Sequence, residues 1–200
     1  MKVTKKWLKE KRACCSEQDM NRAEKELKGD VKLITDTLLK EDRFNDANWL
    51  LTKLMDKNQC IKYAIFAAKQ VLHIFEEKYP KDDRPRKAIE AAENYLKDPS
   101  ENNKKAAYDA AYAAYAAGAT AYAAADAAIY AATHAATYAA AAAHAATSYT
   151  VTSYAAAAAH AATSYTVTSY AAAAADAAHA AAHASDVKTK IIEYGVKILN

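Results

Sequence analysis

The chain has 200 residues, with 27 Lys and Arg against 24 Asp and Glu, and a net charge of +3. Residues 1–105 hold 24 of these basic and 19 of these acidic residues, so the remainder is almost uncharged. Such mild, mixed charge lacks the clustered basic face that duplex binding requires, so nucleic acid is not indicated as a partner. The shift in composition predicts two regions, a charged helical region at 1–105 and an Ala/Tyr/His-rich region at 106–200.

The start of the chain and its thiols indicate a cytoplasmic protein. The opening MKVTKKWLKEKR is basic, but no apolar segment follows it, so no secretory signal is expected. Cys14, Cys15 and Cys60 are odd in number and lack paired metal-ligand spacing, which is typical of reduced thiols. Residues 127–175 carry no formal charge, but they are rich in Ala, Tyr, Thr, Ser and His, so no membrane span is expected.

Apolar residues at helical spacing predict several helices in the charged region. Val31 to Leu39 and Trp49 to Met55 mark two short ones. Ile61 to Phe75 form a longer apolar stripe, and Tyr79-Pro80 should end that helix. The next helix should begin at 82–85, where an acidic cap precedes a Pro in the first turn. No segment alternates for long as a strand would, so the predicted fold class is all-α, with a helical bundle in this region.

A specific motif follows the longer helix. A helix ending in FE…YP precedes D-x-RPR-x-AIEAA across residues 75–92, and an Ala/Tyr/His-rich tail comes after it. This arrangement resembles a family of bacterial and prophage-borne immunity proteins, immunity class five. The closing IIEYGVKIL, residues 191–199, is similar to the ends of phage-borne members. The resemblance implies that the protein binds and neutralises a toxin rather than catalysing a reaction, and it supplies no catalytic residues. We expect no cofactor.

The same motif supplies the candidate binding residues. Arg84 and Arg86 flank a Pro and follow two carboxylates, so we expect salt bridges that tie this loop to Glu76 or Glu90. The alternative is a ligand or partner site at the loop. The candidate binding residues are Glu76, Tyr79, Asp82, Arg84, Arg86 and Glu90.

A stripe of tyrosines opens the second region. Tyr108, Tyr115 and Tyr122 are seven residues apart, with Tyr112 beside them, so they share one face of a helix. We expect this face to pack against small Ala faces of a neighbouring helix while its hydroxyl groups stay in water. The alternative is an aromatic face that stacks a base or another flat ligand.

A tandem repeat occupies the middle of this region. Residues 138–153, YAAAAAHAATSYTVTS, recur unchanged as residues 154–169. Ala favours helix, but a step of 16 residues rotates the pattern by roughly 160° in one continuous helix. The TVT segment before Ser153 is a suitable break. We therefore predict an Ala/Tyr-rich stack of short helices, with one long helix as the alternative. The duplication is a departure from the pattern of the immunity family, and it argues against any function that needs a fixed tail length.

One set of residues has a spacing that could suit a metal ion. Asp176, His179, His183 and Asp186 lie within a sector of roughly 80° on a helix. Two His residues four apart can bind one ion, and a carboxylate can complete its shell. No HExxH motif or Cys partner accompanies them, so a polar or interface stripe is the preferred interpretation and a metal site the alternative. No phosphate loop, GxSxG elbow or Cys/His pair in a defined context is present, so an enzyme is not expected.

Together these observations predict a non-enzymatic binding protein that acts on a protein partner, with a toxin as the candidate. Two alternatives stay open. The first is a small-ligand or nucleotide-signal binding protein that uses the Tyr-rich helices with Arg84 or Arg86. The second is a self-associating helical scaffold, which would form a homo-oligomer.

Overall fold

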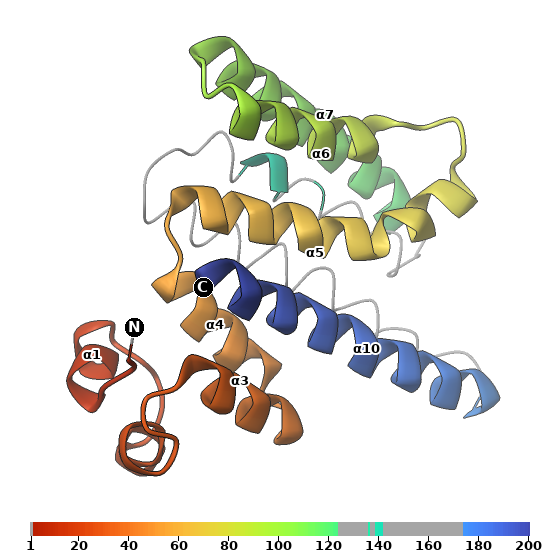
Figure 1. The fold of residues 1–200 in the computed structure, drawn as a ribbon. Coiled ribbons are helices and arrows are strands. Elements are labelled where there is room, and N and C mark those ends of the chain that lie inside the picture. Colours follow the sequence, from red (N-terminus) through yellow and green to blue (C-terminus); the bar gives the residue numbers. More distant parts are fainter. Residues whose placement is uncertain (1, 124–135, 137–138, 142–173) are drawn as a thin grey trace.

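The structure is a computed structural model that describes residues 2–123, 136, 139–141 and 174–200, with the side chains of 118–123 and 174–185 outside the description. Within these ranges every regular element is a helix and none is a strand, which confirms the all-α class (Figure 1). None of the described helices is both long and apolar enough to span a membrane. Most of the 138–153 and 154–169 repeats, and the stack of short helices predicted for them, lie outside the described residues.

The helices predicted in the charged region are present, and further short ones precede them. At the start of the chain, Ser16 and Asp19 form a capping box that begins the second helix. The helices that precede the predicted ones are α1 (Lys5–Glu10), α2 (Glu17–Asn21) and the π-helix η1 (Arg22–Glu26). The others are α3 (Val31–Lys40), α4 (Phe44–Leu54), α5 (Lys57–Lys78), α6 (Arg84–Lys97), α7 (Glu101–Ala123) and α10 (Ala174–Leu199).

Local signals explain where α5 and α6 begin and end. Asp56 and Gln59 form a capping box at the start of α5, and its predicted apolar stripe is buried. Helix α5 ends before Tyr79, as predicted. The acidic cap predicted for α6 is Asp82, whose carboxylate accepts a hydrogen bond from the backbone N–H of Arg84 at 3.2 Å. The side chain of Asp83, at the N-cap position, makes no capping bond.

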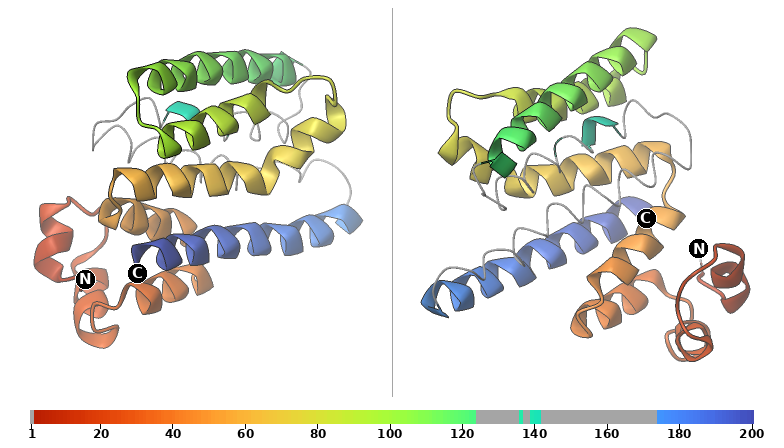
Figure 2. Two further views of the ribbon diagram at one scale, coloured as in Figure 1. Left: turned by 45° about the horizontal axis from the view of Figure 1, so that its top comes forward. Right: turned by 180° about the vertical axis from the view of Figure 1, so that it is seen from behind.

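The helices pack in a sequence of layers that differs from their order in the chain. Helix α7 packs on α6, α6 on α5, and α5 on α10, while α10 also contacts α4 and α3 (Figures 1 and 2). The N- and C-terminal ends lie on the same side of the molecule in all views. Phe75 and Ile191 belong to one apolar core, and the compositional boundary at residue 105 falls inside α7. Both regions of the sequence therefore contribute to the same core.

Helix α7 buries alanines and exposes tyrosines. Tyr108, Tyr112 and Tyr115 are 54%, 72% and 53% exposed. The buried face of the helix consists of Ala107, Ala111, Ala114 and Ala117. Small side chains let α6 and α7 approach closely, whereas Tyr rings between them would hold the helices apart. The prediction that the tyrosine stripe packs against a neighbouring helix is thus wrong for Tyr112, the most exposed of the three, and the side chain of Tyr122 lies outside the described residues.

A close contact fixes the last helix against the middle of the fold. A Cβ atom at Gly195 would lie 2.7 Å from Leu51 Cδ1 and 2.8 Å from Tyr63 Cε2. Both of those side chains are fully buried, so neither has room to move aside. Only a residue without a side chain permits this approach of α10 to α4 and α5.

We predict that Gly195→Ala lowers the free energy of unfolding. Overpacking a filled core costs ~1–3 kcal/mol. Because Ala has a better helix propensity than Gly, the substitution also stabilises α10 by at most ~1 kcal/mol, which offsets only part of this cost. Urea unfolding followed by circular dichroism measures the difference. Lys197→Ala, on the exposed side of the same helix, is the control and should not be destabilised. A Gly195→Ala protein as stable as the parent would contradict the close contact.

Candidate functional site

A cavity of about 320 Å³ lies between the N-terminal helices and the α3–α4 pair. Its volume is at the lower end of the range of ligand pockets, ~300–1,000 Å³. Apolar side chains from the start of the chain, α1, the segment after η1, α3 and α4 form its walls. These side chains include Val3, Leu8, Leu27, Ile34, Trp49 and Leu50. The walls are thus apolar and come from segments that are not adjacent in the sequence.

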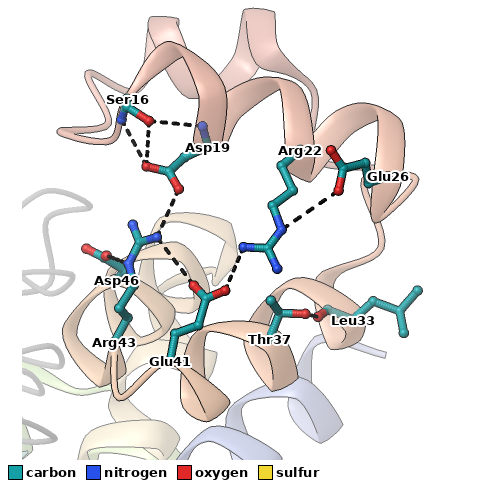
Figure 3. A network of polar contacts seen from close by, with 9 residues as sticks. All are labelled: Ser16, Asp19, Arg22, Glu26, Leu33, Thr37, Glu41, Arg43 and Asp46. Atoms are coloured by element: carbon teal, nitrogen blue, oxygen red, sulfur yellow. Dashed lines mark hydrogen bonds and ion pairs between the residues drawn. The ribbon is translucent and has the colours of Figure 1, made fainter.

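Five charged residues line the same cavity and form a network of ion pairs, which we call the charged ring (Figure 3). Arg22 Nη1 donates to Glu41 Oε1 at 2.6 Å. Arg43 Nη1 donates to Asp19 Oδ1 at 2.9 Å, and Arg43 Nε donates to Asp46 Oδ2 at 2.7 Å. Arg43 Nη1 also lies 3.6 Å from Glu41 Oε2, which joins the two sets of pairs. The charged ring therefore connects the N-terminal helices to α3 and α4.

Local structure explains why these side chains meet. The hydroxyl of Ser16 accepts from the backbone N–H of Asp19 at 3.1 Å and donates to Asp19 Oδ2 at 2.8 Å, so this carboxylate is held at the start of α2. Arg22 follows three residues later and lies on the same side of the helical segment. Asp42 adopts a φ of 53° in the turn between α3 and α4. This turn places Glu41 and Arg43 on either side of it, both facing the N-terminal helices (Figure 3).

The hydrogen bonds within the charged ring favour the ionised forms of Asp19 and Arg43. Hydrogen bonds, first from Arg43 and then from Ser16, lower the pKa of Asp19 below its usual range. The pKa of Arg43 is raised by its hydrogen bonds to Asp19 and Asp46. Burial, followed by the nearby charge of Asp19, raises the pKa of Cys15, which also lines the cavity. The thiol therefore stays protonated near neutral pH, which suits binding better than nucleophilic chemistry.

The residues of the sequence motif make pairs among themselves, away from this cavity. Arg86 donates from Nε and Nη2 to the two carboxylate oxygens of Glu76, both at 2.7 Å, so the predicted bidentate bridge between α5 and α6 is confirmed. Arg84 pairs with Asp82 at 2.8 Å and 2.5 Å rather than with Glu76 or Glu90.

The two remaining motif residues do not join these pairs. The ring of Tyr79 lies against Phe75 with 5.2 Å between centroids. Glu90 is exposed, and among the described residues it forms no ion pair. The motif residues thus lie close in the fold, but none of them lines the cavity beside the charged ring.

The metal candidate falls largely outside the described side chains. Asp176, His179 and His183 belong to α10, but nothing is described of their side chains. Asp186 is exposed and lies 3.4 Å from Lys190 as an ion pair. Among the described residues no group of three or more His, Cys, Asp or Glu side chains is placed to bind a metal ion.

Sequence reasoning missed the cavity and its charged ring. The Ser16–Asp19 capping box is visible as a local pattern and marks a helix start. Nothing local indicates that Asp19 meets Arg43, which is 24 residues away. The contact cannot be predicted from the sequence, because it forms only when the N-terminal helices dock against α3 and α4.

The described residues define an all-α protein with an apolar cavity beside a ring of ion pairs. The chain belongs to a family of unknown function (DUF6931), whose sequence model matches residues 34–192. No curated protein and no solved structure matches it. The family match carries no functional description, so the likeness to immunity proteins stays a prediction. Glu41, Arg43 and Asp46 lie within the matched range, whereas Asp19 and Arg22 precede it.

We predict that the contribution of Asp19 to stability depends on pH. Its pKa is lower in the folded state, so its stabilising effect is present above the unfolded-state pKa of ~3.9 and is lost as pH falls through the folded pKa. Asp19→Asn should therefore lower the free energy of unfolding by about 1 kcal/mol near neutral pH. The two proteins should converge in acid.

Urea unfolding of both proteins between neutral pH and acid measures this convergence. Asp186→Asn is the control, because that side chain is 68% exposed and its ion pair with Lys190 lies along its own helix. If the free energies of unfolding of Asp19→Asn and the parent differed by the same amount at every pH, the lowered pKa of Asp19 would be wrong.

Proposed function

We propose that this protein is a non-enzymatic binding protein that holds a small amphipathic molecule in the cavity between the N-terminal helices and α3–α4. The observation that carries the proposal is the combination of apolar walls with a charged ring at one cavity. Ligand sites typically pair apolar walls with a few convergent polar groups. The paired charges and the protonated Cys15 thiol support binding without chemistry at this site.

The walls and the charged ring together describe the ligand. Water in the cavity finds few polar partners on the apolar walls, so an apolar body that replaces it gains roughly 25 cal/mol for each Å² removed from water. The charged ring contains Arg22 and Arg43 against three carboxylates, all of them in ion pairs. A neutral or zwitterionic head group with both donors and acceptors fits this ring. A phosphate would meet the carboxylates, which disfavours a nucleotide here.

We predict that filling the cavity abolishes ligand binding. Ala23 lines the cavity and is 8% exposed, so the ring of Ala23→Phe would occupy the space of the ligand. Mass spectrometry of organic extracts compares the molecules that co-purify with the parent and with the variant from the native host. Ala106→Phe, on the exposed side of α7, is the matched control and should retain the ligand.

A panel of neutral and zwitterionic amphipathic molecules provides a second measurement. A ligand at 100 times its Kd adds ~2.7 kcal/mol to the free energy of unfolding, which a thermal-shift assay detects. Stabilisation should occur with the parent protein and not with Ala23→Phe. An unchanged bound molecule in Ala23→Phe, or no stabilisation of the parent by any of them, would rule the proposal out.

The exposed tyrosines favour a second candidate function, binding of a protein partner. Tyr108, Tyr112 and Tyr115 lie on the outer face of α7, and Tyr is enriched among the residues that dominate binding energy at protein interfaces. The resemblance of the sequence to immunity proteins makes a toxin the candidate partner. In this alternative, the tyrosine face of α7 contacts the partner and the cavity plays no part.

We predict for this candidate that Tyr112→Ala weakens partner binding. Truncating a dominant interface residue costs ~2 kcal/mol or more, which corresponds to about a 30-fold loss of affinity. Co-purification from a native host that expresses the neighbouring genes, followed by an affinity measurement, provides the test. Asn102→Ala, exposed on the same helix, should bind as the parent does. If no specific protein co-purifies with the parent, or Tyr112→Ala binds equally well, this candidate is wrong.

A further inference from the structure

A second hollow, of about 330 Å³, lies where α5, the end of α6 and α10 meet, and we call it the lysine groove. Its lining includes the aromatic residues Phe66 and Tyr194, which we call its aromatic floor. Its lining also includes Lys62, Lys69, Lys97 and Glu93. The groove therefore combines an aromatic floor with three positive charges and one negative charge. None of its lining residues is shared with the cavity beside the charged ring.

The aromatic floor is fixed by packing between distant segments. The rings of Phe66 and Tyr194 stack with 4.0 Å between centroids and 6° between their planes. Each ring remains partly exposed. Burial raises the pKa of Tyr194, and the nearby positive charge of Lys69 acts in the opposite direction. The stacked pair is thus an ordered and partly exposed aromatic surface, with the charge of Lys69 close to Tyr194.

The charges around the groove are not balanced. Lys69 Nζ lies 2.5 Å from Glu93 Oε1, and this is the carboxylate that lines the groove. Lys62 and Lys97 are exposed and make no ion pair with any described residue. The charged ring differs, because all of its five charges are paired with one another. An anion placed between Lys62 and Lys97 would supply the ion pairs that these two lysines do not form with the described residues.

We propose that the lysine groove binds a small anion with a flat apolar body, an aromatic ring system that carries a carboxylate or phosphate group. The ring system packs on the Phe66–Tyr194 floor, as aromatic surfaces do with flat ligands. The anionic group accepts hydrogen bonds from the ammonium groups of Lys62 and Lys97, which are stronger than bonds between neutral partners. This anionic ligand differs from the neutral or zwitterionic ligand proposed for the cavity.

The experiment titrates the full chain with 2-naphthoate and with its neutral counterpart 2-naphthamide, using isothermal calorimetry. We expect 2-naphthoate to bind about tenfold more tightly, as one additional charge-assisted hydrogen bond provides. Lys62→Gln combined with Lys97→Gln should remove this preference and leave the binding of 2-naphthamide unchanged. Tyr194→Leu should weaken both ligands, since it removes the flat floor.

Matched controls separate this site from general charge effects and from the cavity. Lys81→Gln combined with Lys87→Gln removes the same number of exposed positive charges, from the α5–α6 loop and the first turn of α6, and should bind 2-naphthoate as the parent does. Ala23→Phe should also leave this binding intact, because Ala23 lines the other cavity. Melting temperatures of all variants verify that they fold.

Adenosine monophosphate and adenosine form a second pair that distinguishes the source of the anion. Tighter binding of the monophosphate that depends on Lys62 and Lys97 assigns a phosphate ester, and the same dependence for 2-naphthoate alone assigns a carboxylate. The proposal is overturned if the charged and neutral members of both pairs bind equally. It is also overturned if the Lys81 and Lys87 variant loses as much affinity as the Lys62 and Lys97 variant.

Discussion

The close approach of α10 to α4 and α5 at Gly195 is the contact on which the rest of the structure depends. It brings the end of the chain into the core formed by the first half, where Ile191 and Ile192 are buried with Phe75 and Leu51. Lys188 adds an ion pair to Asp42 at 3.0 Å, beside the α3–α4 turn. Helix α10 thereby holds the two helices that form one side of the cavity, and it supplies Tyr194 to the lysine groove.

Apolar burial, rather than the charged ring, holds the N-terminal helices in place. Val3 is buried in a cluster with Ile34 and Leu50, and its backbone N–H donates to Gly29 O at 2.9 Å. Gly29 has a φ of +64°, and a Cβ atom there would lie 2.5 Å from Val3 O, so the chain passes itself here without room for a side chain. Partly exposed ion pairs contribute little free energy each, so the charged ring mainly sets the register of this docking.

The cavity and the lysine groove differ in how they relate to the family. The groove residues on α5 and α6 all lie within residues 34–192, the range matched by the family, and Tyr194 lies just beyond it. The cavity instead combines matched residues of α3 and α4 with the preceding N-terminal segment. The two sites also differ in charge, since Lys62 and Lys97 of the groove form no ion pair with another described residue, whereas the charges of the cavity are paired with one another.

The sequence by itself determined the helical class, the buried stripe of α5 and its end before Tyr79, because each depends on residues close together in the chain. It also predicted a salt bridge from the arginine pair to Glu76 or Glu90, but only the structure decided that Arg86 pairs with Glu76 and Arg84 with Asp82. The tertiary structure alone decided that α7 buries its alanines and exposes Tyr112, since this depends on which neighbour approaches. It also decided the stack of Phe66 on Tyr194 and the pair of Asp19 with Arg43. No local pattern specifies such contacts, because they form only when separate helices pack against one another.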